Sequence, residues 1–190
     1  LANLKKVADY AVCRNVEVLV ETNGHFADSK RMLSLVEKAG DNVGVIWDIH
    51  HPYRFFGESP EYTVGVLGKR IKHVHVKDSK MSGSKVEYTM MGYGDVPIAK
   101  CVDVLNKAGY AGSYCLEWVK RWNLSLEEPG IAATPYSHYL PGGSHGEEVG
   151  PVGDDLGLRN GTKPLGIQGL RPWTRMWQSL DGRVMSVLQY

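Results

Sequence analysis

Residues Val43–Pro52 read VGVIWDIHHP, a short apolar run that ends in an acid and two histidines. A buried parallel strand is typically a continuous apolar run of this kind rather than an alternating one. In α/β proteins the chemistry lies at the carboxyl ends of parallel strands, which is where Asp48, His50 and His51 fall. A single strand followed by a polar loop is also an ordinary structural feature, so the significance of this stretch depends on whether the pattern recurs.

The pattern does recur, because segments with helical spacing alternate with short apolar runs along the first 128 residues. We predict helices over Asn3–Val12, Ser29–Ala39, Pro60–Lys69 and Pro97–Ala108, and strands over Val16–Val20, Val43–Trp47, Ile71–Val76 and Ser113–Leu116. The polar, glycine-containing segment Lys77–Gly94 is predicted to be a long loop. Alternation of helices and strands indicates an α/β fold with a parallel sheet and right-handed crossovers.

A faint internal repeat relates the second and fourth strands. The segments EKAGDNVGVIWD (37–48) and NKAGYAGSYCLE (106–117) each contain a Lys-Ala-Gly helix end, a short turn, a strand and a final carboxylate. Asp48 follows Gly40 by eight residues, and Glu117 follows Gly109 by the same number. The same backbone path should therefore bring both carboxylates to the same height in the sheet.

Each of the four predicted strands ends in a side chain that can bind a metal: Glu21, Asp48, His75 and Glu117. Three carboxylates and one imidazole form a hard, anionic ligand set that suits Mn²⁺, Mg²⁺ or Co²⁺, and Zn²⁺ also accepts these ligands. Four protein ligands around a six-coordinate ion leave two positions for neighbouring hydroxyl and carbonyl oxygens of a substrate. The ion would then act as a Lewis acid, and a pair of carboxylates could remove and return a proton beside the carbonyl.

Other polar residues near the strand ends are candidates for binding the substrate. His51 lies three residues beyond Asp48, and Lys77 follows His75 at the mouth of the third strand. Arg54 and Arg121 are cationic groups near the same rim that could hold a phosphate or carboxylate, although a solvated surface position is the commoner one for such residues. We interpret His50 as structural and His73 as a core histidine.

Composition and charge restrict the class of protein. Hydrophobic residues make up 43% and charged residues 23%, as in an ordinary globular domain. The net charge of +1 gives no reason to expect nucleic-acid or membrane partners. Three scattered cysteines have no metal-type spacing, which favours a reducing, cytoplasmic location. Residues 129–190 are dense in glycine and proline and are predicted to form an irregular, disordered tail, with loop or disorder over Thr134–Pro172 and one short hairpin around Asp181-Gly182.

Several motifs together resemble the xylose-isomerase-like sugar phosphate isomerase/epimerase family. The resemblance rests on VETNG at Glu21, WDIHHP at Asp48 and His51, HVHVKD at His75, GYGDVP at Gly92–Pro97 and CLEWVKRW at Glu117. It implies that residues 1–128 are the C-terminal half, strands five to eight, of a (β/α)₈ TIM barrel. It also implies one divalent metal ion bound by the four strand-end residues, Glu21 and Glu117 as the acid/base pair, His51 as a substrate contact, and a sugar or polyol ketone as substrate.

Two alternative functions remain open from the sequence. A half barrel exposes two sheet edges, so the chain could be a non-catalytic fragment that binds metal weakly, or one that associates with another half barrel. A DNA-repair endonuclease of the same superfamily would need more histidine and acid ligands and a basic groove, and the net charge of +1 argues against it.

Overall fold

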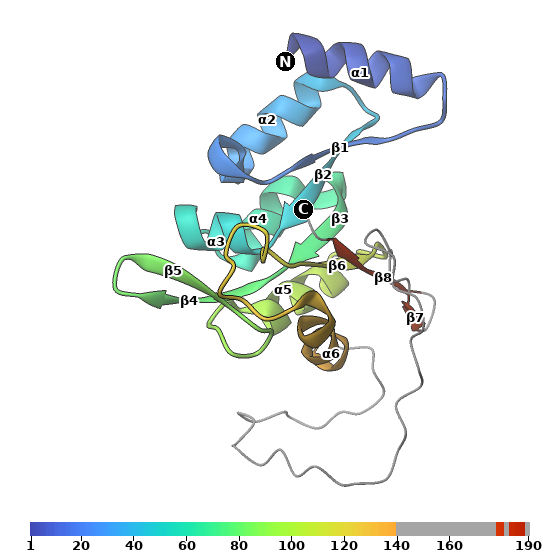
Figure 1. Ribbon diagram of the computed structural model, residues 1–190. Coiled ribbons are helices and arrows are strands. Elements are labelled where there is room, and N and C mark those ends of the chain that lie inside the picture. Colours follow the sequence, from blue (N-terminus) through green and yellow to red (C-terminus); the bar gives the residue numbers. More distant parts are fainter. Residues whose placement is uncertain (140–177, 181–182, 189–190) are drawn as a thin grey trace, which may run out of the picture.

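The computed structural model describes residues 1–139, 178–180 and 183–188, and its centre is a parallel β-sheet (Figure 1). Strands β1 (Val18–Glu21), β2 (Val43–Asp48), β3 (Ile71–Val76) and β6 (Tyr114–Glu117) lie side by side in this order, and each neighbouring pair is parallel. The predicted α/β fold with a parallel sheet is therefore confirmed, consistent with part of a TIM barrel.

Helix α1 (Ala2–Val12) precedes β1, and α2 (Ser29–Ala39), α4 (Pro60–Leu67) and α5 (Ile98–Lys107) lie in the connections between the four strands. Contacts run from α1 to α2, from α2 to α4 and from α4 to α5, so the helices form a continuous layer beside the sheet (Figure 1). The side chains of Asp28 and Ser59 accept hydrogen bonds from the first turns of α2 and α4, as N-caps do. None of the helices in the described ranges is long and apolar enough to cross a bilayer.

The hydrophobic core lies between the sheet and this helical layer. Val43, Val45 and Trp47 of β2 are buried, as are Met32 and Val36 of α2. Burial of apolar surface contributes about 25 cal/mol per Å², so this layer is the main source of stability. It also fixes β2 in place and thereby positions Asp48, the last residue of that strand.

Regular structure also forms where the sequence pattern does not predict it. The chain after Asp48 enters a short helix, α3 (His50–Phe56), for which no prediction is made. The predicted loop Lys77–Gly94 contains an antiparallel hairpin of β4 (Asp78–Ser82) and β5 (Lys85–Thr89). The hairpin projects from the body of the molecule (Figure 1), so its strands do not show the apolar alternation of a strand with one buried face.

The predicted irregular tail is also partly wrong. Helix α6 (Pro129–Tyr139) begins at a proline, which is tolerated in the first turn because its missing N–H would have no intrahelical partner. The buried side chains of Ala132 and Tyr136, one turn apart, anchor α6 to the core. The predicted loop Thr134–Pro172 is therefore incorrect as far as Tyr139, and its remainder lies outside the described residues.

The predicted C-terminal hairpin is confirmed by two strands. Strands β7 (Gln178–Leu180) and β8 (Arg183–Leu188) pair antiparallel to each other. Strand β8 also pairs in parallel with β6, which extends the sheet on that side. The C-terminal region thus covers the edge of β6, an arrangement that composition alone does not indicate.

The other edge of the sheet is open in the described part of the chain. Strand β1 pairs only with β2 there, and all four of its residues are half-buried, whereas all four residues of β6 are buried. The neighbouring α1 leaves Val7, Tyr10 and Val12 exposed by 54%, 64% and 58%. An unpaired strand beside exposed apolar side chains is a ready template for association.

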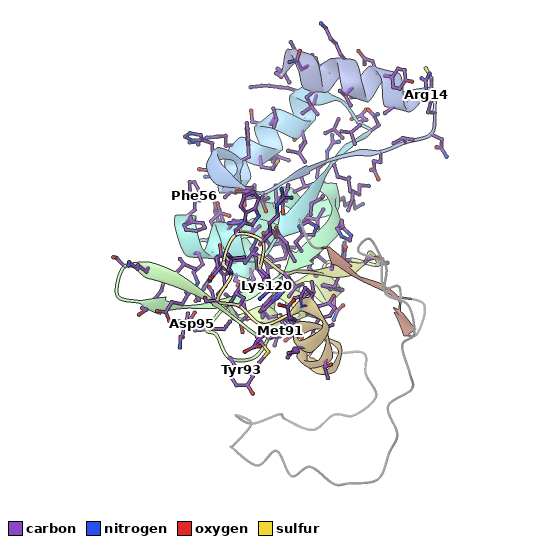
Figure 2. All side chains as sticks on the ribbon, in the orientation of Figure 1. Arg14, Phe56, Met91, Tyr93, Asp95 and Lys120 are labelled. Carbon is purple, nitrogen blue, oxygen red and sulfur yellow. The ribbon has the colours of Figure 1, made fainter. Side chains whose placement is uncertain are left out.

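We therefore expect this edge to mediate reversible self-association of the chain. Sedimentation velocity over a wide concentration range should show a dimer that Tyr10→Glu weakens, because a charge would be buried at the contact. Tyr93→Glu is the matched control, since Tyr93 is similarly exposed but lies far from α1 (Figure 2). A monomer at every concentration would contradict this expectation.

Candidate metal centre

The four strand ends named from the sequence meet at one point. Glu21 ends β1, Asp48 ends β2, His75 lies next to the end of β3, and Glu117 ends β6. Each offers a ligand-type atom, and these atoms all lie within 4.8 Å of one another. Because the strands are parallel neighbours, residues separated by almost a hundred positions reach the same edge of the sheet. In the register of the sheet, Asp48 pairs with His75 and His75 pairs with Cys115, so Glu117 lies two residues beyond the level of Asp48, although its side chain reaches the same cluster.

His75 points one ring nitrogen into the cluster of carboxylates. Its Nδ1 lies 2.7 Å from Glu21 Oε1 and 3.7 Å from Glu117 Oε2. Its Nε2 is buried and has no hydrogen-bond partner in the described part of the chain. Nδ1 is thus the nitrogen placed to bind an ion shared with the two glutamates.

Backbone and side-chain hydrogen bonds hold Asp48 rigidly. The Thr22 hydroxyl donates to the Asp48 carbonyl oxygen and accepts from the Asp48 amide, which ties the ends of β1 and β2 together. Asp48 Oδ1 accepts a hydrogen bond of 2.9 Å from the His50 amide. The other oxygen, Oδ2, contacts the side chains of His51 and Lys77.

Lys77 inserts its ammonium group among these ligands. Lys77 Nζ lies 2.5 Å from both Asp48 Oδ2 and Glu117 Oε2, and 3.0 Å from His51 Nε2. Its side chain is 3% exposed, so the ion pairs are shielded from solvent. The ammonium therefore neutralises part of the negative charge of the three carboxylates that lie close together at this site.

The pKa values in the cluster follow from this arrangement. Burial alone would raise the pKa of Asp48, but the charge of Lys77 and the hydrogen bonds from His51 and Lys77 hold it well below its usual range. Burial disfavours a charged Lys77, yet the two carboxylates outweigh that effect and raise its pKa above the ordinary value. Burial also raises the pKa of Glu117; Asp48 adds to the rise, whereas Lys77 opposes it.

The donor set fits a divalent cation. Three carboxylates and one imidazole are all within reach of one ion, and the carboxylate oxygens are the ligands that hard cations prefer. Asp48 Oδ2 and Glu117 Oε2 are the same atoms that Lys77 contacts, so an ion and the Lys77 ammonium compete for them. Two other groups of ligand-type residues overlap this one: Asp48 with His50 and His51, and His73 with His75 and Cys115.

His50 and His51 have different environments, although both lie in the first turn of α3. His51 Nε2 is 3.1 Å from Asp48 Oδ2 and faces the cluster; its role as a substrate contact stays a prediction. His50 is fully buried and its Nε2 contacts Ser79 Oγ at 2.9 Å. Burial lowers the pKa of His50 to about 3, so it is neutral and acts as a packing residue.

The two arginines predicted to bind substrate are not part of the cluster. The Arg54 guanidinium donates to the hydroxyl and carbonyl oxygens of Ser79 and pairs with Asp95, which joins α3 to the β4–β5 hairpin. Arg121 is exposed and lies over the ring of Trp122, 5.3 Å from its centroid. Tyr88 of β5 was not predicted, because its segment was interpreted as a loop; its ring stacks on His50.

Comparison with known proteins gives one family match. Residues 1–136 match the family described as xylose isomerase-like TIM barrel. A xylose isomerase domain protein from Planctomyces limnophilus is a structural neighbour with 16% sequence identity and a TM-score of 0.47. The alignment covers 65% of this chain and 44% of that one, so the chain spans less than half of its length. Comparison with curated proteins gives no match.

The position of Lys77 predicts that Lys77→Met will raise the affinity for Mn²⁺ roughly tenfold or more, because the ion no longer displaces an ammonium group. Without metal, the same variant should lose about 3–5 kcal/mol of stability, because Asp48 and Glu117 keep buried charges without their partner. Titration calorimetry measures the Mn²⁺ affinity, and thermal melts measure the stability.

Lys72→Met, at a surface ion pair, is the control. Equal Mn²⁺ affinity in wild type and Lys77→Met would refute the competition.

Proposed function

Since the chain belongs to the xylose isomerase-like TIM barrel family, we propose that it isomerises or epimerises a sugar or sugar-like polyol ketone with one divalent metal ion. The family match confirms the resemblance recognised in the strand-end motifs. The observation that supports the activity is the convergence of Glu21, Asp48, His75 and Glu117 at one edge of the sheet. We assign β1, β2, β3 and β6 to barrel strands five to eight, and residues 1–128 to the C-terminal half of the barrel.

The same four residues would hold the ion. Mn²⁺, Mg²⁺ and Co²⁺ suit a ligand set rich in carboxylates, and Zn²⁺ is also compatible. When bound, the ion would supply Lewis-acid polarisation of the substrate carbonyl. The chain itself has to supply the proton transfer, the orientation of the substrate and the exclusion of water.

Glu21 and Glu117 are the proposed acid/base pair. Their carboxylates approach Nδ1 of the same histidine from different strands, so a substrate carbon beside the carbonyl could lie between them. One carboxylate removes the proton from that carbon, and the other returns a proton to the product. Burial raises the pKa of Glu117, which makes its carboxylate a stronger base than a solvated one.

His51 and Lys77 are the proposed substrate-orienting groups. Both contact Asp48 Oδ2 in the structure, so they lie beside an oxygen that would help to hold the ion and are placed to contact a substrate bound there. An ammonium and an imidazole can each donate a hydrogen bond to a sugar hydroxyl or carbonyl oxygen. Arg54 is an unfavourable substrate ligand, because its donors already hold Ser79 and Asp95.

A second candidate function is metal binding without turnover by a half barrel. Two observations favour it: Lys77 already neutralises Asp48 and Glu117, and the β1 edge is open in the described residues. The two candidates differ in a simple measurement. The half barrel without activity would be stabilised by Mn²⁺ and would leave every ketose unchanged.

We expect saturating Mn²⁺ to raise the melting temperature by about 5–10 °C, because ligand at a hundred times Kd adds about 2.7 kcal/mol of stability. Differential scanning calorimetry with and without a chelator measures this shift. The absence of any shift would exclude the metal-dependent activity.

Glu117→Gln should lower kcat for ketose isomerisation or epimerisation by about 10²–10⁴-fold, because the amide cannot accept the proton. The activity is measured on a panel of ketoses with Mn²⁺. Glu127→Gln is the control, since Glu127 is exposed and lies outside the cluster. Undiminished turnover by Glu117→Gln would remove Glu117 from the acid/base pair.

A further inference from the structure

We propose that Tyr88 on the β4–β5 hairpin is a substrate-binding residue whose hydroxyl donates a hydrogen bond to a hydroxyl or carbonyl oxygen of the sugar or polyol. This inference rests on the proposed function and adds a residue from outside the parallel sheet to its site. It depends on three observations: the hairpin is anchored beside the site, the Tyr88 ring stacks on His50, and the Tyr88 hydroxyl makes no hydrogen bond in the described residues.

The hairpin is fixed to the mouth of the site. Strand β4 begins at Asp78, the residue directly after Lys77. Tyr88 of β5 lies opposite Ser79 of β4 in the antiparallel register. Ser79 Oγ contacts His50 Nε2 at 2.9 Å and accepts from Arg54 Nε at 2.8 Å. Helix α3 therefore holds β4 in place, and β4 in turn positions Tyr88 on the paired strand β5.

The loop after the hairpin reinforces this anchor. The Asp78 carboxylate accepts hydrogen bonds from the amides of Gly92 and Gly94. A Cβ at Gly94 would collide with that carboxylate and with the Ser79 carbonyl, so only glycine allows this close approach. Asp95 then pairs with Arg54 beside the hairpin (Figure 2). The hairpin is therefore a preorganised wall of the site rather than a free surface loop.

The Tyr88 ring is held close to the metal ligands through a chain of aromatic contacts. It stacks on His50 with a centroid distance of 5.2 Å and an interplanar angle of 29°. The His50 ring meets the His51 ring edge-on at 5.3 Å, and His51 contacts Asp48. Phe55 stacks on His51 at 5.6 Å. Tyr88 and Phe55 thus flank the two histidines that follow Asp48.

The Tyr88 hydroxyl has an unused hydrogen-bonding capacity. The side chain is half-buried, and within the described ranges its hydroxyl makes no hydrogen bond. A phenol in such a position usually pairs with a polar group. Burial raises the pKa of Tyr88, and the charges of Lys77, Asp48 and Glu117 also act on it. The ring lies beside His50, next to the candidate metal centre, and the raised pKa keeps the phenol a protonated donor.

These properties suit a ligand rich in hydroxyl groups. A site that hydrogen-bonds a substrate hydroxyl discriminates strongly against an analogue that lacks it. Tyr88 lies on a different element from Glu21, Asp48, His75 and Glu117, so it can contact a part of the substrate that is remote from the reacting carbon. Its contribution should therefore appear in substrate binding more than in the chemical step.

The test compares wild type, Tyr88→Phe and Tyr93→Phe in the full chain loaded with Mn²⁺. Tyr88→Phe keeps the ring that stacks on His50 and removes only the hydroxyl. Tyr93→Phe removes a hydroxyl from an exposed tyrosine whose ring points outward (Figure 2). Calorimetry measures the binding of D-glucitol, a polyol without a carbonyl, and steady-state kinetics measures KM and kcat for the ketose that wild type converts fastest.

We expect Tyr88→Phe to weaken D-glucitol binding and raise KM by about fivefold to twentyfold, with kcat changed less than twofold and Mn²⁺ affinity unchanged. Tyr93→Phe should match wild type.

Equal D-glucitol affinity in wild type and Tyr88→Phe would overturn the inference while leaving the proposed function intact. If D-glucitol binding depends on Tyr88 but no ketose is converted, the role of Tyr88 in binding is supported and the proposed isomerase or epimerase activity is refuted. If wild type binds no D-glucitol and no ketose, Tyr88 has no ligand and the inference fails.

Discussion

The pairing of one buried ammonium with two buried carboxylates is the interaction on which the rest of the site depends. Three carboxylates gathered at the end of a hydrophobic sheet repel one another, and the low dielectric surroundings increase the energetic cost. Lys77 offsets this cost by contacting Asp48 and Glu117 together. A divalent cation supplies twice the charge at the same oxygens, so the geometry that stabilises the metal-free protein also marks where an ion would bind.

The parallel sheet is what makes this gathering of charge possible. In such a sheet, every strand presents its carboxyl end at the same edge, so four short sequence motifs can converge without any long-range sequence signal. The Thr22 hydroxyl bridges the ends of β1 and β2, and His75 bridges Glu21 and Glu117. These links make the site a rigid extension of the core rather than a property of mobile loops.

The two edges of the sheet have different environments. Strand β8 pairs with β6, whereas β1 is unpaired on its outer side within the described residues. The family to which the chain belongs is a closed barrel, and closure removes all sheet edges. Any partner that extends the sheet at β1 would therefore shield the apolar side chains of α1 without disturbing Asp48 or His75, which lie on interior strands.

The sequence by itself determined the alternation of α1, α2, α4 and α5 with β1, β2, β3 and β6, and the four ligand-type residues at the ends of those strands. These features depend on local periodicity, on capping residues such as Asp28 and Ser59, and on the repeated interval from glycine to carboxylate. Only the tertiary structure decided the pairing of Lys77 within the cluster, the use of Arg54 as a clamp on Ser79, and the placement of Tyr88. Each depends on side chains brought together from distant positions. The hairpin and α6 escaped prediction because their stability comes from contacts with the rest of the protein rather than from a pattern within their own residues.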